Sequence, residues 1–219
     1  MYASLPYRIK KQQLWLSPER CIFWEEQKSL IIADLHFGKT GHFRKAGIPV
    51  PQSLYKEDLQ RLVAQIQYFQ PKKLIIVGDL FHSKENKEFA LFKKWRDNFP
   101  GLEIHLIRGN HDILEDSWYA EAGVLLSEEK MKDGYFHFIH DISRLPEPEP
   151  AAYFFSGHIH PGVRVSGNGK QSLCFPCFYF DENYAVLPAF SRFTGLALIK
   201  PKSGGKVFAI VENNIIQLL

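Results

Sequence analysis

The sequence predicts an α/β protein built from two layered β-sheets, a β-sandwich, flanked by helices. In the first half, apolar β-branched runs alternate with amphipathic segments in the order strand, helix, strand, helix, strand, which is typical of βαβ units. In the second half, short strands separated by turn residues follow one another, and helix signals are sparse. No internal repeat and no linker divides the chain, so we expect a single domain over residues 1–219.

The elements of the first half are predicted from their apolar patterns. The segments QLWLS, CIFWE and SLIIAD are short β-rich runs, which indicate an antiparallel set leading into a central strand. KKLIIVGD and LEIHLIRGNHD are further strands, the first of a type that is buried on both faces of a sheet. KEFALFKKWRDNF predicts one helix, and Ser53 to Phe69 another that ends before Pro71. In that second helix the apolar positions recur at i, i+3, i+4 and i+7, namely Leu59, Leu62, Val63 and Ile66.

Composition places the chain among ordinary globular proteins, with 45% hydrophobic and 23% charged residues. No apolar run approaches the ~18 residues needed to span a membrane, and the N-terminus lacks the apolar core of a signal peptide. We therefore expect a cytoplasmic protein without membrane contact. Its cysteines, Cys21, Cys174 and Cys177, are odd in number, which argues against a disulfide framework, and CFPC lacks the second pair that a zinc site needs.

Residue types that bind metal ions follow the predicted strands, at the point where each strand ends. They are Asp34, His36, Asp79, Asn110, His111, Asp112, His140, His158 and His160. Ligands of open α/β sheets bind at the carboxyl ends of the strands, so we expect these side chains to converge on one crevice. Carboxylate, imidazole and amide donors suit Mn, Fe or Zn better than Ca. These are more donors than a single metal ion needs. Two ions that share one bridging carboxylate would account for the number of donors.

The order of these motifs resembles a known family. Asp-x-His, Gly-Asp, Gly-Asn-His-Asp, a lone His and Gly-His-x-His, in this order over residues 34–160, are similar to the calcineurin-like metallophosphoesterases, which have an αββα fold. The segments ADLHFGKTGHFRKAGIPVP, GDLFHS, PCF and LPAFSRFTG resemble the bacterial ligase-associated DNA damage response endonuclease branch. The resemblance implies that Asp79 bridges two ions. It also implies that one ion is held by Asp34, His36 and His160, and the other by Asn110, His140 and His158.

The same resemblance implies roles for residues that bind no ion. His111 would face the substrate and protonate the leaving oxygen or stabilise developing charge, and Asp112 would steady its loop. Many relatives have an Asp three residues after the bridging Asp to orient the catalytic His, and this chain has His82 there. An imidazole can accept a hydrogen bond but adds no fixed negative charge. We count His111, Asp112 and His82 as catalytic candidates.

Basic residues follow the first donor pair. Lys39, His42, Arg44 and Lys45 are candidates to bind the phosphates of a nucleic-acid substrate, although such residues also occur on solvated loops. Arg192 in PAFSRFTG is a further substrate-binding candidate. The first 100 residues are net basic and the remainder net acidic, which agrees with a polyanionic partner.

The predicted function is therefore a dinuclear metal-dependent phosphodiesterase, with Mn or alternatively Fe or Zn, in which a metal-bridging hydroxide attacks phosphorus. The resemblance implies a DNA-repair endonuclease, with repair proteins such as an ATP-dependent ligase as partners. Two alternatives remain open. The same ligands serve phosphomonoesterases and nucleotide pyrophosphatases, and some relatives act as non-catalytic scaffolds. The oligomeric state does not follow from the sequence.

Overall fold

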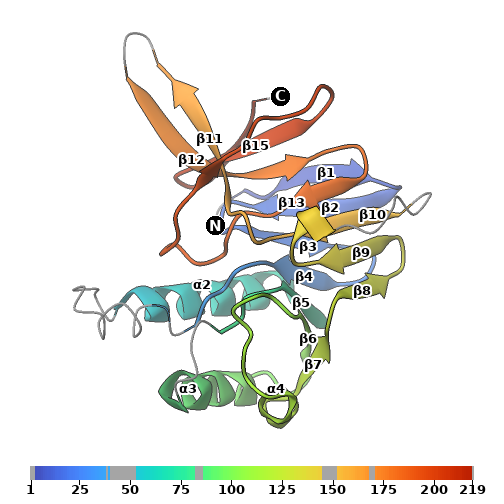
Figure 1. Cartoon of the computed structure of the whole chain (residues 1–219), viewed down its shortest axis with the longest axis vertical. Helices are drawn as coiled ribbons and strands as arrows, with labels where there is room; N and C mark the ends of the chain where they lie inside the picture. The colour runs from blue at the N-terminus through green and yellow to red at the C-terminus, as the bar shows by residue number, and fades with distance from the viewer. Residues whose placement is uncertain are drawn as a thin grey trace.

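In the computed structural model, two β-sheets lie face to face, and α-helices cover the outer face of the first sheet (Figure 1). The structure describes residues 3–37, 39, 53–81, 86–144, 152–167 and 171–218, with only the backbone of 53–55 and 86–88. The predicted fold class, α/β with two sheets and flanking helices, is confirmed. Among the described residues, the α-helices lie on one side of the sandwich only.

The first sheet has the strand order β1-β2-β3-β4-β5-β6-β7. Its strands are β1 (Leu5–Ile9), β2 (Gln12–Ser17), β3 (Cys21–Trp24), β4 (Ser29–Ile32), β5 (Lys73–Val77), β6 (Glu103–Ile107) and β7 (Val124–Ser127). From β1 to β4 the pairing is antiparallel, and from β4 to β7 it is parallel. The predicted antiparallel opening and the βαβ order are both confirmed. The parallel strands β4, β5 and β6 therefore end at the same edge of the sheet.

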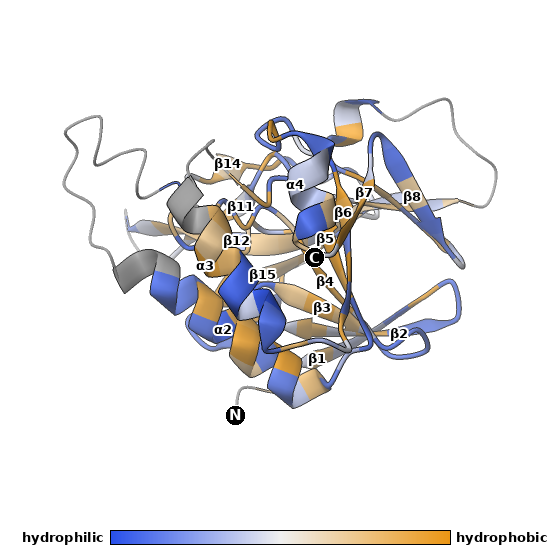
Figure 2. Cartoon of the chain, turned by 90° about the horizontal axis from the view of Figure 1, so that it is seen from below, coloured by the Kyte–Doolittle hydropathy of each residue, from blue (hydrophilic) through white to orange (hydrophobic). Residues whose placement is uncertain are grey.

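Among the described residues, three α-helices pack on this sheet, namely α2 (Ser53–Phe69), α3 (Asn86–Asp97) and α4 (Asp116–Glu121). Hydrophobic and hydrophilic residues alternate along α2 (Figure 2), as its sequence pattern predicts. Leu62 and Ile66 are buried in the core between helices and sheet, and Leu59 and Val63 pack against them. No helix in the described ranges is long and apolar enough to cross a membrane.

The second sheet follows the order β14-β11-β12-β13-β10-β9-β8, with β15 paired to β12 and β16 paired to β15. Its strands are β8 (Lys130–Asp133), β9 (Phe136–Ile139), β10 (Tyr153–Ser156), β11 (Pro161–Ser166), β12 (Ser172–Phe180), β13 (Tyr184–Val186), β14 (Ala197–Leu198), β15 (Lys206–Val211) and β16 (Asn214–Gln217). A 3-10 turn, η1 (Ile142–Arg144), follows β9. The β9 and β10 strands are parallel neighbours, so their ends also lie together. The β11–β12 hairpin extends away from the helices (Figure 1).

The alternation of side chains along β4 explains why both faces of the first sheet are apolar. Leu30 and Ile32 pack against the helices, whereas Ile31 and Ala33 pack against the second sheet. The core between the sheets is rich in aromatic residues, among them Trp24, Phe136, Phe155, Phe180 and Phe208. Each fully buried large apolar side chain contributes about 1.5–3 kcal/mol to folding. The two sheets are thus held in fixed positions, and the ends of β4, β5, β9 and β10 meet between them.

Candidate metal centre

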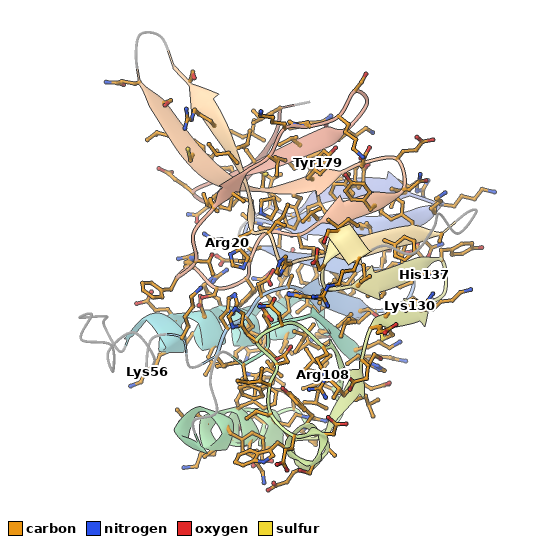
Figure 3. All side chains as sticks on the ribbon, viewed as in Figure 1. Arg20, Lys56, Arg108, Lys130, His137 and Tyr179 are labelled. Carbon is orange, nitrogen blue, oxygen red and sulfur yellow. The ribbon has the colours of Figure 1, made fainter. Side chains whose placement is uncertain are left out.

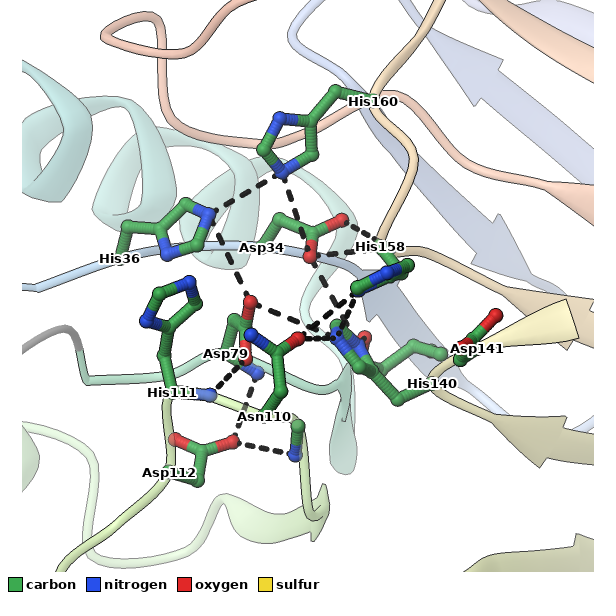
Figure 4. A network of polar contacts seen from close by, with 12 residues as sticks. Asp34, His36, Asp79, Asn110, His111, Asp112, His140, Asp141, His158 and His160 are labelled. Carbon is green, nitrogen blue, oxygen red and sulfur yellow. Dashed lines mark hydrogen bonds and ion pairs between the residues drawn. The ribbon is translucent and has the colours of Figure 1, made fainter. Parts of the chain in front are cut away.

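The loops after five strands deliver the predicted donors to one place (Figure 4). Asp34 and His36 follow β4, Asp79 follows β5, and Asn110 follows β6 from the first sheet. From the second sheet, His140 follows β9, and His158 and His160 follow β10. These strands are short buried runs, so the first polar residue after each strand emerges where the core ends. The centre therefore lies between the two sheets, as expected for carboxyl ends of parallel strands.

The first group of donors consists of Asp34, His36 and His160. Nε2 of His36 lies 3.3 Å from Nε2 of His160, and that atom lies 3.7 Å from Oδ1 of Asp34. Asp34 is fully buried and His36 nearly so. Three potential ligand atoms of two chemical kinds are thus close enough together to bind one ion.

A second group contains Asp34, Asp79 and His140. Oδ2 of Asp79 lies 3.6 Å from Nε2 of His140 and 3.9 Å from Nε2 of His36. The Asp79 carboxylate therefore lies between a histidine of the first group and one of the second. Burial raises the pKa of Asp79, and the nearby His140 opposes that rise.

Asn110 and His158 extend the second group. Oδ1 of Asn110 lies 3.1 Å from Nε2 of His140 and 3.0 Å from Nδ1 of His158, and those two nitrogens are 3.2 Å apart. The backbone N–H of His158 also donates to Oδ2 of Asp34 at 3.0 Å, which connects this loop to the first group. An amide oxygen and two imidazole nitrogens therefore converge beside Asp79.

The donor set fits divalent cations. The carboxylates of Asp34 and Asp79 are buried, and their ion pairs in the described part of the chain are with imidazoles. Burying two carboxylates so close together is costly unless positive charge compensates them. Nitrogen and oxygen donors without thiolate suit Mn, Fe or Zn. The residues present can therefore hold metal ions, in agreement with the metal dependence predicted from the sequence.

Several donors have a backbone conformation that L-residues rarely adopt. Their φ angles are positive: Asp34 54°, His36 51°, Asp79 54°, His158 70° and His160 51°. Such conformations cost about 1–3 kcal/mol each and persist where the surrounding structure enforces them, often at functional sites. The strain at these positions turns each side chain out of its strand direction and toward the centre.

Two glycines make room for the carboxylates. A Cβ atom on Gly109 would lie 2.2 Å from Oδ1 of Asp79, and one on Gly157 would lie 2.7 Å from Oδ2 of Asp34. A Cβ on Gly109 would also lie 2.4 Å from the backbone nitrogen of Asp79, so neither position can carry a side chain unless the carboxylate and its surroundings move. The glycines in the Gly-Asn-His-Asp and Gly-His-x-His motifs are thus explained by close approach.

Asp112 organises the loops from beneath the centre. Its Oδ2 accepts hydrogen bonds from the backbone N–H groups of Asp79 and Gly109, at 2.8 and 2.9 Å, and its Oδ1 accepts one from Phe81 at 3.1 Å. Burial raises the pKa of Asp112 to about 7, although these hydrogen bonds favour its charged form. Its carboxylate contacts the backbone and not the donors, so it positions the loops after β5 and β6.

His111 lies at the edge of the centre, next to His36. The two rings are 5.4 Å apart between centroids, and the backbone N–H of His111 donates to Oδ1 of Asp79 at 2.9 Å. Figure 4 shows its imidazole beside the donors and not among the second group. His82, its predicted partner, falls outside the described residues.

Of the predicted substrate-binding residues, Lys39 and Arg192 are described, whereas His42, Arg44 and Lys45 are not. Burial lowers the pKa of Lys39, and the charges of Asp34 and Asp79 oppose this, so its ammonium lies in the field of the centre. Nη2 of Arg192, in contrast, lies 3.3 Å from Oε2 of Glu19, and its side chain is 47% exposed. The structure thus pairs Arg192 with Glu19, a carboxylate that it shares with Arg61.

The sequence did not indicate the segment that supports Asp34 from the other side. The backbone N–H groups of Phe190 and Ser191 donate to the carbonyl oxygens of Ala33 and Asp34, at 2.7 and 3.3 Å. Arg61 of α2 donates to the carbonyl of Phe190 at 3.0 Å, and its guanidinium stacks on the Phe190 ring. The segment of Phe190 and Ser191 was singled out in the sequence only for the resemblance of LPAFSRFTG and for Arg192, and no role was assigned to Arg61.

Comparison with known proteins agrees with this arrangement. The sequence profile of the calcineurin-like phosphoesterases matches residues 28–146. Among solved structures, the nuclease MPE of Pseudomonas putida is 28% identical with a TM-score of 0.82, over 98% of this chain and 100% of that one. The phosphoesterase Yfce of E. coli is 14% identical with a TM-score of 0.47, over 87% of this chain and 97% of that one. No curated protein sequence matches the chain.

Proposed function

Because the chain belongs to the calcineurin-like phosphoesterase family and is a metal-dependent phosphoesterase, we propose that it hydrolyses phosphodiester bonds of nucleic acid with two bound divalent cations. The similarity to a nuclease over 98% of the chain is the observation that supports nucleic acid as the substrate. The observation that supports two ions is the position of Asp79 between His36 and His140.

In this proposal, one ion is held by Asp34, His36 and His160, the other by Asn110, His140 and His158, and Asp79 contacts both. Mn is the proposed metal, with Fe or Zn as alternatives, since all three accept this donor set. Two such cations supply charge neutralisation of the phosphate and activation of water as a nucleophile. The whole chain is proposed to form one domain around this centre.

The remaining roles belong to the side chains around the donors. His111 lies beside the first group, where its imidazole can donate a proton to the leaving oxygen or stabilise developing charge. Asp112 holds the backbone of Asp79 and Gly109, so the carboxylate of Asp79 keeps its orientation during the reaction. Lys39 adds positive charge near the bound phosphate.

A role in DNA repair is part of the proposal, and it is supported by the resemblance of residues 33–51 and 187–195 to the ligase-associated endonuclease branch. A non-catalytic scaffold is disfavoured because every donor position is occupied by a residue that can bind metal. Phosphomonoesterase activity uses the same donors, so the substrate has to be tested directly.

The experiment is cleavage of covalently closed circular single-stranded DNA by Mn-loaded protein, with EDTA as control. Conversion of circles to linear strands only in the presence of metal is the expected result, because an exonuclease cannot act on a circle. Intact circles together with hydrolysis of a phosphomonoester would contradict the nuclease and leave a small-molecule phosphatase. A catalytically inactive His111→Ala protein serves as a control for contaminating nucleases.

A further inference from the structure

A cavity of about 450 Å³ opens beside the candidate centre, and Asn110, His140 and His158 form part of its wall. The rest of the wall comes from the loop after β6, the β7–β8 turn and the residues after β9. Asp141, another wall residue, lies on the far side of His140 from His36 (Figure 4). The cavity, here called the Asn110 cavity, therefore continues from the second group of donors away from the first. Small-molecule sites typically have volumes of ~300–1,000 Å³.

The charged side chains of this wall balance one another. Its cations are Arg108, Lys130 and Arg144, and its anions are Glu128, Glu129 and Asp141. Nε of Arg108 lies 2.8 Å from Oε2 of Glu128, and Nε of Arg144 lies 3.6 Å from Oδ2 of Asp141. Figure 3 labels Arg108, which directly follows β6, and Lys130, the first residue of β8. A subsite for phosphate would show an excess of positive charge, and the described residues of this wall show none.

An uncharged group with many polar atoms suits such a wall better than a phosphate does. A nucleoside offers hydroxyl, amide and ring nitrogen atoms, which carboxylates, guanidinium groups and the Asn110 amide can bond. Ile139 adds apolar surface against which a base or sugar can pack. In a nucleic acid, each scissile phosphate carries a nucleoside on either side, and the cavity begins where the phosphate would be bound.

We propose that the Asn110 cavity binds one nucleoside of the phosphodiester substrate, next to the phosphate at the candidate centre. This inference rests on the proposed phosphodiesterase function. It names the part of the substrate that the enzyme recognises beyond the phosphate, and it assigns the β7–β8 turn, which carries Glu129, as a part of the wall that determines specificity.

The test compares diesters that share one leaving group, p-nitrophenolate, with Mn-loaded full-length protein. The substrates are methyl p-nitrophenyl phosphate and the 5′- and 3′-(p-nitrophenyl phosphate) esters of thymidine. We expect kcat/KM for one thymidine ester to exceed that for the methyl ester by about tenfold or more, the discrimination that a single filled pocket provides. Most of the difference should lie in KM, because the pocket contacts are made in the ground state as well.

Two matched variants test whether the preference for the thymidine ester depends on the Asn110 cavity. Glu129→Trp puts an indole into the cavity from an exposed turn, and Leu125→Trp puts one on β7 outside the cavity, where Leu125 is 53% exposed. Glu129→Trp should abolish the preference for thymidine, whereas Leu125→Trp should keep both that preference and the rate on the methyl ester.

The outcomes separate this inference from the proposed function. Hydrolysis of the methyl ester without preference for either thymidine ester, or a preference that survives Glu129→Trp, would overturn the inference alone. A gain that appears only when the thymidine carries an additional phosphate would also overturn it, because the cavity would then be a phosphate subsite. Failure to hydrolyse any diester would overturn the proposed function and the inference together.

Discussion

The backbone N–H of His111 donates a 2.9 Å hydrogen bond to Oδ1 of Asp79. Since the donor is a backbone group, this bond remains when the imidazole of His111 is removed. The structure therefore allows the chemistry of the imidazole to be separated from the support that its residue gives to the carboxylate.

His111→Ala is expected to lower kcat by about 10²- to 10⁴-fold, the usual contribution of a general acid or base, with metal content unchanged. The loss should be smaller for a p-nitrophenyl ester than for DNA, because p-nitrophenolate leaves without a proton. Steady-state kinetics beside elemental analysis measures both. His105→Ala, on β6 and paired with Glu103, is the matched control. Loss of bound metal together with activity would assign His111 as a ligand instead.

Asp79→Ala is expected to remove metal binding, since its carboxylate lies between the two groups of donors. Addition of Mn to about 100 times its Kd stabilises a folded protein by about 2.7 kcal/mol, so the wild-type melting temperature should rise and that of Asp79→Ala should not. Thermal unfolding with and without Mn measures this, and Asp97→Ala at the exposed end of α3 is the control. An equal rise in both variants would place the ions elsewhere.

Gly109→Ala is expected to reduce metal content and activity together, because the added Cβ would lie 2.2 Å from Oδ1 of Asp79. Gly101→Ala is the matched control, since a Cβ there meets no atom within 4 Å. Elemental analysis and diesterase assays on both variants give the answer. Wild-type metal content in Gly109→Ala would show that the carboxylate can move without loss of the site.

Asp112→Asn is expected to destabilise the fold by about 1–3 kcal/mol, because the new amide N–H₂ must face a backbone N–H that has lost its acceptor. For a chain of this size each kcal/mol lowers the melting temperature by about 2–4 °C. Calorimetry in EDTA measures the change without contribution from bound metal. Asp97→Asn should melt like the wild type, and an unchanged Asp112→Asn would mean that the loops find other acceptors.

We expect the stability of the protein to depend on pH through Asp181, which is not part of the metal centre. Its pKa is lowered, chiefly because hydrogen bonds from Glu182, Tyr184 and Lys202 outweigh its partial burial. A carboxylate with a lower pKa in the folded state stabilises the protein above its unfolded pKa of ~3.9, and this contribution is lost as the pH falls through the folded value. Asp181→Asn should therefore flatten the acid side of the stability curve below about pH 4. Urea unfolding at several pH values measures this, with Glu182→Gln as control; parallel curves for wild type and Asp181→Asn would refute it.

Local patterns predicted the strand and helix order from β2 to β6 and the convergence of the donors, whereas strands β1, β7, β8 and β16 were not predicted. The burial of Leu62 and Ile66 follows from helical spacing, and the position of Asp34 follows from a buried strand that ends at a sheet edge. Helix α4 was not predicted, because six residues are too few for an apolar period to appear.

The support of the centre could not be predicted, since it depends on contacts between residues far apart in the sequence. Arg61 forms ion pairs with Asp58 and with Glu19, which lies 42 positions away, and its side chain is only 10% exposed. Arg192 joins the same cluster through Glu19. Only the packing of α2 against the β2–β3 turn brings these charges together.

His36 and His160 are in contact although they are 124 residues apart in the sequence. His36 follows a strand of the first sheet, and His160 follows a strand of the second. An ion held by both residues would close a chain loop of that length, so it would act as a cross-link as well as a cofactor. Cross-links of long loops stabilise proteins chiefly by lowering the conformational entropy of the unfolded chain. The docking of one sheet on the other and the assembly of the catalytic centre would then be a single thermodynamic event.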